Sequence, residues 1–309
     1  MKSLLTTLSV LTLATTTGNL INILNTIEEK TNITTNYIQS KTQQDTIYKN
    51  KNGEEIKTNI EDLSEIESKE VVQIGFYKNR QGEIQVARMP ETIEKVPDKL
   101  PSEVTSLNFM FLGASQFNQD LSTWDVSRVT SMLSVFAGAT SFNGNISNWD
   151  VSNVTDMLSM FNGSLKFDQD LSKWNVSNVR SVGGMFAGAS SFNGNISICD
   201  VSNVRSMSGM FTGCFLFNRD LSNWNVSSVE DMVGTFANTL AFNQDLSTWD
   251  VSNVRIMTGM FAGSVLFDQD LSKWNVSNVL DHTHFAVGSA ISNSNKLPKF
   301  KNFFINNTI

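Results

Sequence analysis

A period of 25 residues between residues 107 and 285 is the feature that most limits what this chain can fold into. Three aromatic positions keep the period. Phenylalanine occupies two of them without exception, one from Phe117 through Phe267 and the other as Phe111, Phe136, Phe161, Phe186, Phe211, Phe236 and Phe261. Tryptophan occupies the third, with Cys199 in place of one ring, as Trp124, Trp149, Trp174, Trp224, Trp249 and Trp274. A unit of this size cannot bury a core alone, so the units must stack on one another.

The consensus unit, F-N-x-D/N-L/I-S-x-W-D/N-V-S-N-V-x-x-M-x-x-M-F-x-G, divides into two halves. In one unit, the apolar residues from Val154 to Phe161 are spaced by three, three and one, which places them on one face of a helix. Ser152 suits the N-cap of that helix, and Gly163 suits the left-handed residue that ends it. The other half, residues 142–151, is rich in β-prone side chains. The sequence therefore predicts an α/β repeat solenoid of seven 25-residue coils with short parallel strands and short helices.

The first 25 residues have the order of a secretory signal. Lys2 precedes an apolar run at residues 4–13, and small residues follow at 14–18. No charged residue occurs from Ser3 to Ile27, so an uncleaved anchor is the alternative. Residues 1–25 therefore predict an exported protein, either secreted or at the cell surface. We expect membrane contact only through this segment, and only if it is uncleaved.

The segments on either side of the repeats differ from them in composition. Residues 26–70 contain no Phe, Trp or Pro and predict a flexible polar tether. Residues 71–106 hold two β-prone runs around a turn at 78–82, which predicts a β-hairpin that caps the N-terminal end of the stack. Residues 286–309 are predicted to form a C-terminal tail that partly caps the other end.

The charge of the chain excludes one class of partner. The net charge is −7, and residues 107–285 hold 15 acidic and 8 basic side chains. Nucleic-acid binding needs a basic face, so we expect no nucleic-acid partner. The repeats contain no nucleophile–base set and no phosphate-binding loop, and a unit that is copied seven times is a poor place for a single active site. The sequence therefore predicts no enzymatic activity and no cofactor.

The tryptophan row has two interpretations. It can belong to the core, or it can form an exposed aromatic stripe that binds a ligand. Flanking apolar residues favour the core, whereas strand parity relative to Leu121 allows Trp124 to face outward. The candidate stripe consists of Trp124, Trp149, Trp174, Trp224, Trp249 and Trp274.

Three further residue sets suggest chemistry less strongly. Stacked coils would align Asp120 and its counterparts in a row, which allows a calcium ladder or, more simply, a row of turns that bind their own backbone. His282 and His284 could suggest a metal, but they lie where the repeat decays. Cys199 and Cys214 replace core residues of the unit, so packing is the simpler interpretation and a disulfide is the alternative.

The units also carry a family resemblance. FNQDLSTWDVSRV and FNGNISNWDVSNVTDMLSMFNGS resemble the short repeats of mycoplasmal and Gram-positive surface proteins of the BspA-like leucine-rich-repeat group. The resemblance covers residues 107–285, and TIEKVPDKLPSEVTSL resembles the usual lead-in. It implies a leucine-rich-repeat-like fold, export, and a role in adhesion or surface variation, and it supplies no catalytic residues. Many members are lipid-anchored, but no cysteine follows the apolar run here.

Together these features predict an exported, non-enzymatic surface protein whose solenoid binds a protein or host-surface partner, as an adhesin does. The alternative is a structural or antigenically variable coat component without a dedicated ligand. Residues 167–179 and 267–279 are identical. Since packing needs only residue type, this identity indicates recent duplication, and we expect repeat number to vary between related chains. An exported enzyme is a distant third hypothesis.

Overall fold

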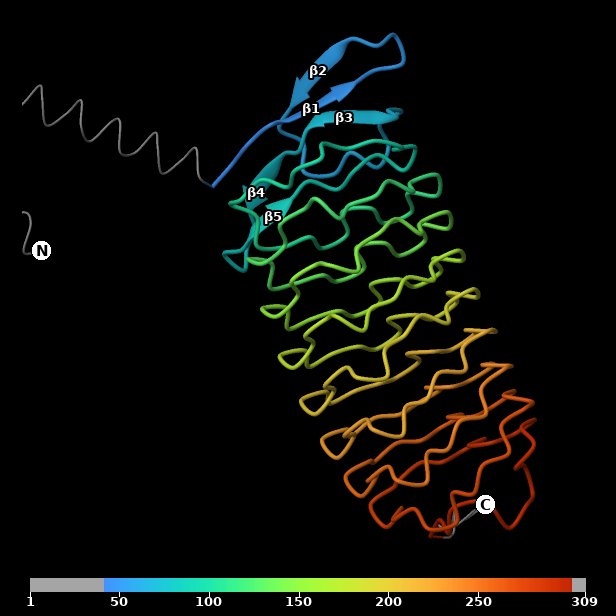
Figure 1. Ribbon diagram of the computed structural model, residues 1–309. Helices are drawn as coiled ribbons and strands as arrows, with labels where there is room; N and C mark the ends of the chain where they lie inside the picture. The colour runs from blue at the N-terminus through green and yellow to red at the C-terminus, as the bar shows by residue number, and fades with distance from the viewer. Residues whose placement is uncertain (1–41, 302–309) are drawn as a thin grey trace, which may run out of the picture. The chain divides into compact units, whose positions relative to one another are not determined.

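Each 25-residue unit forms one coil, and successive coils lie side by side in the computed structural model, which describes residues 42–301 (Figure 1). One parallel β-bridge links each coil to the next, at residues 25 apart, from Ser106 through Ser131 to Asp281. We call a set of residues spaced in this way a row. The coils belong to a compact unit that begins at Asp45. No helix long and apolar enough to cross a membrane occurs in residues 42–301.

The α/β class with short helices is wrong, because residues 42–301 contain no helix. The predicted helical segment forms consecutive turns, and its backbone N–H groups alternate between two acceptors. The N–H of Met160 donates to the carbonyl of Met157 at 3.2 Å, within the coil. The N–H of Phe161 donates to the carbonyl of Met185 at 2.8 Å, in the next coil. A helix would need both donors for itself, so stacking competes directly with helix formation.

Left-handed residues also prevent a helix. Each coil carries two positions with positive φ, four residues apart. Gly163 has φ of 70°, as the sequence predicted, and Asn238, the one departure from Gly in that row, has φ of 55°. Asn tolerates this conformation better than most side chains. The other left-handed row contains Phe109, Ser134, Ser159, Gly184, Gly209, Gly234, Gly259 and His284.

The predicted parallel strands of the coils reduce to the single bridge in each coil. The five strands of residues 42–301 all precede the repeats. They are β1 (Thr46–Lys49), β2 (Glu55–Thr58), β3 (Glu70–Gln73), β4 (Phe76–Lys78) and β5 (Ile84–Val86). β1 pairs antiparallel with both β2 and β3, and β4 pairs antiparallel with β5.

These strands alter two predicted boundaries. The predicted flexible tether at 26–70 is wrong for residues 46–58, because β1 and β2 form an ordered sheet there. The residues of the predicted hairpin form β4 and β5, in which Tyr77 pairs with Gln85. Gln85 in turn bridges Ser106 of the first coil, so this hairpin covers the N-terminal end of the stack. The predicted signal or anchor at 1–25 lies outside the described residues.

The core of the stack is a set of aromatic columns. The rings of Phe111 and Phe136 lie parallel with centroids 5.4 Å apart, and this contact recurs in every coil to Phe261. A second phenylalanine column begins with Phe117 and Phe142, at 5.8 Å. At the C-terminal end, Phe300 packs edge-on against Phe285 at 5.0 Å, so the described part of the tail covers the last coil.

Candidate functional site

The tryptophan row is part of the core, and the exposed-stripe alternative is wrong. The six rings are between 3% and 6% exposed. Each indole N–H donates to a backbone carbonyl of the preceding coil or cap, for example Trp149 to Leu121 at 3.0 Å and Trp174 to Ile146 at 3.1 Å. Burial removes the apolar ring from water, and the carbonyl satisfies its polar atom. The rings are Trp124, Trp149, Trp174, Trp224, Trp249 and Trp274.

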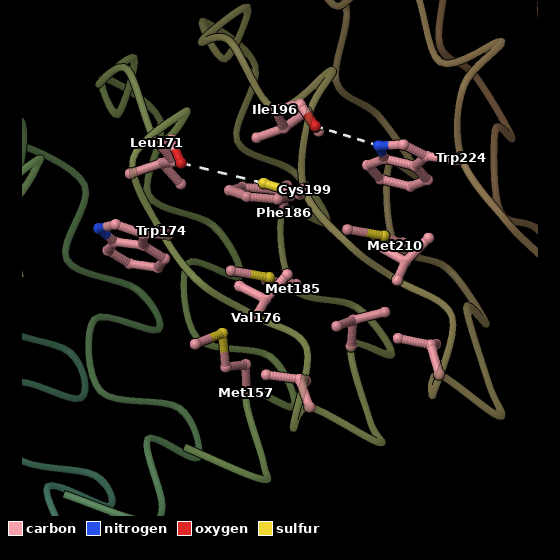
Figure 2. A pocket seen from close by; sticks show the side chains of 14 residues that line it. Met157, Leu171, Trp174, Val176, Met185, Phe186, Ile196, Cys199, Met210 and Trp224 are labelled. Atoms are coloured by element: carbon pink, nitrogen blue, oxygen red, sulfur yellow. Dashed lines mark hydrogen bonds between the residues drawn. The ribbon is translucent and has the colours of Figure 1, made fainter. Parts of the chain in front are cut away.

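Cys199 interrupts this column and leaves space. An apolar cavity of about 30 Å³ lies between Trp174 and Trp224, where the row has no ring (Figure 2). The carbonyl of Leu171, which would accept an indole N–H at this place, meets the Cys199 Sγ at 3.9 Å. The cavity has no polar group that suggests a ligand, so we interpret it as a packing defect of one coil.

The two cysteines are free and buried, so the disulfide alternative is wrong in this structure. Burial raises the pKa of the Cys199 thiol to about 11 and raises the pKa of the Cys214 thiol further. The Cys214 Sγ also donates to the carbonyl of Phe186 at 2.9 Å. Both groups are therefore neutral thiols at physiological pH, which does not fit a nucleophile or a metal ligand.

We expect a thiol reagent at pH 8 to react with neither cysteine of the folded protein. About a thousandth of Cys199 is thiolate at that pH, given its raised pKa, and burial leaves Cys199 9% exposed and Cys214 fully covered. In denaturant, two thiols for each chain should react promptly, which absorbance of the released chromophore measures. Rapid reaction of the native protein, or fewer than two reactive thiols in denaturant, would contradict this assignment.

The aspartate rows bind their own backbone, which fits the simpler interpretation of these residues. Asp120 accepts the backbone N–H of Ser122 at 2.8 Å, and Asp125 accepts that of Ser127 at 3.0 Å. Hydrogen bonds from these serines lower the pKa of both carboxyls.

The ring of His282 stacks on the ring of Phe300, with centroids 4.1 Å apart. Within the described part of the chain, no group of three or more His, Cys, Asp and Glu residues could hold a metal ion.

The structure instead reveals an exposed apolar surface that the sequence analysis missed. It lies at the turns that follow Gly213, Asn238 and Gly263, in the three coils that begin at residues 211, 236 and 261. Phe215 is 47% exposed and Leu266 is 58% exposed. The N–H of Ala241 donates to the carbonyl of Phe215 at 3.1 Å, so the turns of neighbouring coils stack. We call this surface the apolar patch: Phe215, Leu216, Leu240, Ala241, Val265 and Leu266.

The apolar patch is not required by the fold. Its two positions in the unit are variable, and other coils carry polar pairs there, at 115–116, 140–141 and 190–191. The core is complete in those coils without apolar side chains at the turn. The sequence could therefore have revealed the patch, because its apolar residues stand at positions of the unit that have no fixed residue type. Contiguous exposed apolar side chains are typical of binding surfaces.

Stacked 25-residue coils with a continuous aromatic core define a tandem-repeat protein, and this one carries an exposed apolar patch. The sequence matches a family described as "Mycoplasma protein of unknown function, DUF285" twice, at residues 92–199 and 192–300. These matches cover more than half of the chain, and the chain belongs to this family. The description agrees with the mycoplasmal part of the resemblance and says nothing of BspA-like leucine-rich repeats. No curated protein and no solved structure matches the chain.

Proposed function

We propose that this chain is an exported, non-enzymatic surface protein whose coils bind a protein on another cell surface. The observation that carries the proposal is the apolar patch, which exposes large side chains at positions where the fold accepts Ser, Thr and Gln. The signal-like order of residues 1–25 and the membership of a mycoplasmal repeat family support export.

The charge around the apolar patch indicates the chemistry of the partner. The same three coils carry Asp220, Asp245 and Asp270 on their surface. Hydrogen bonds from Ser222 and Ser272 lower the pKa of Asp220 and Asp270, so these carboxylates are charged at neutral pH. A partner that fits would place apolar side chains on the patch and Lys or Arg beside it. Exposed acidic side chains outnumber exposed basic ones such as Arg219 in these coils, which disfavours an anionic lipid surface.

A patch variant should lose binding and keep its stability. The variant Phe215→Ser, Leu216→Gln, Val265→Thr, Leu266→Ser inserts the pairs that the chain itself carries at 115–116 and 140–141. We expect at least tenfold weaker binding of the labelled protein to cultured animal cells, measured by flow cytometry, because truncated hot-spot side chains typically cost more than about 1 kcal/mol each.

The matched control is Leu158→Ser, which removes an exposed leucine outside the patch and inserts the residue of Ser208 in the same row. It should bind as the unaltered protein does. Equal binding by the patch variant would reject the patch as the contact.

Protease treatment of intact source cells, followed by mass spectrometry, tests export. Peptides from the repeats should be released, and repeats that stay protected would reject a surface location.

A coat component without a dedicated ligand is the second candidate. The identity of residues 167–179 and 267–279 favours it, because recent duplication is expected where repeat number itself is selected. The same binding experiment separates the two functions. Release of the repeats by protease together with no cell binding by the unaltered protein would favour the coat.

A further inference from the structure

A hollow of about 250 Å³ lies where the N-terminal cap meets the first coil, away from the apolar patch. Glu61, Asp62 and Arg88 line one part of it, and Tyr77 and Phe109 line another. Backbone hydrogen bonds fix these segments to each other. The N–H of Arg88 donates to the carbonyl of Glu61 at 2.8 Å, Tyr77 pairs with Gln85 between β4 and β5, and Arg88 follows β5 by two residues. The hollow is therefore formed by ordered backbone.

The charges of the hollow favour a cation. The guanidinium of Arg88 pairs with Glu91 at 2.8 Å and with Asp62 at 3.5 Å, so its charge is compensated. Glu61 has no ion-pair partner within residues 42–301. Glu61 and Asp62 line the hollow together with Tyr77. Burial, together with the negative charges of these two carboxylates, raises the pKa of Tyr77. An incoming positive charge would meet one uncompensated carboxylate.

The aromatic wall is the second observation, and Phe109 is its unusual member. Its φ of 62° lies in the left-handed region, which a bulky side chain adopts at a cost, and its ring is 37% exposed. The same row has Ser134 and Ser159 with similar φ, so the fold does not need an aromatic ring there. Among residues 42–301, neither Phe109 nor Tyr77 stacks on another ring. Both residues line the hollow.

We propose that this hollow binds an organic ammonium cation, held between the rings of Phe109 and Tyr77 and paired with the Glu61 carboxylate. Aromatic faces attract ammonium groups through the ring quadrupole, and a neighbouring carboxylate adds charge pairing. The cation is either a free amine or the lysine side chain of a polypeptide, which share this chemistry. The site is independent of the apolar patch, which lies four coils further along the stack.

Ligand-observed NMR titration of the full chain tests the site with three probes. They are choline, an acetylated pentapeptide with a central lysine, and the same peptide with norleucine. We expect saturable binding of choline, the lysine peptide or both, and none of the norleucine peptide. Glu61→Gln and Phe109→Ser should each weaken binding about tenfold or more. Phe109→Ser inserts the residue of the next two coils, so it should fold, which circular dichroism checks.

The matched control is Glu55→Gln, which removes an exposed carboxylate of β2 outside the hollow and should leave binding unchanged. Binding of choline identifies a site for small free ammonium compounds. Binding of the lysine peptide alone identifies a site for a polypeptide side chain. Absence of binding by both cations, or binding that persists equally in Glu61→Gln and Phe109→Ser, would overturn the proposal.

Discussion

A chain that lacks residues 143–167 is expected to fold with one coil fewer and to unfold cooperatively within about 10 °C of the full chain. The deletion joins Phe142 to Asp168, the same step that Phe167 and Asp168 make in the full chain. It brings Trp124 beside Trp174, as Trp124 now lies beside Trp149 at 6.5 Å. The inter-coil hydrogen bonds are between backbone groups, so the new neighbours supply equivalent acceptors.

The matched deletion removes half a unit, residues 155–167. It takes out both phenylalanines of one coil and places every later row out of register with the rows before it. Because alternate N–H groups in the turns of each coil donate to carbonyls 24 residues ahead, this chain cannot restore those hydrogen bonds. We expect loss of cooperative thermal unfolding by circular dichroism. Equal behaviour of the two deletions would show that register does not hold the stack together.

The stacking of coils could be predicted from the sequence, because a fixed period constrains which residues become neighbours whatever the local backbone does. The absence of a helix from each coil could not be predicted. The spacing from Val154 to Phe161 fits a helical face, but it fits tight turns equally well when alternate N–H groups bond to the next coil. The left-handed residue Ser159 in mid-segment gave no warning, since only half of its row is glycine.

The candidate sites also differ in how far the sequence could predict them. Burial of Trp149 could be suspected from its apolar neighbours, but its carbonyl acceptor lies in another coil and depends on the stacked geometry. Phe215 and Leu216 could have indicated the apolar patch, because they occupy variable positions of the unit and the other positions already complete the core. The hollow beside Phe109 depends on how the cap docks on the first coil, which no local pattern encodes.

The substitution Cys199→Trp is expected to stabilise the protein, because it restores the residue that six other coils carry in this row. An indole at position 199 would fill the cavity of about 30 Å³ between Trp174 and Trp224, and its N–H would find the carbonyl of Leu171. It would also complete a column in which three neighbouring pairs of rings, Trp124–Trp149, Trp149–Trp174 and Trp249–Trp274, lie 6.4 Å to 6.5 Å apart. We expect a gain of about 1–3 kcal/mol, from reversal of a large-to-small core change. Thermal unfolding should report a midpoint higher by about 2–10 °C.

The mirror substitution, Trp249→Cys, should lower stability by about 3 kcal/mol or more, because it opens a cavity and leaves the carbonyl of Leu221 without its indole donor. The two variants exchange the same two residue types at equivalent buried positions, so charge and exposed surface are unchanged and only the column differs. Opposite shifts in the unfolding midpoint would assign the effect to the continuity of the column. A fall in both variants would instead show that the coil around Cys199 has repacked to suit the thiol, and that the gap between Trp174 and Trp224 is matched to its present side chains.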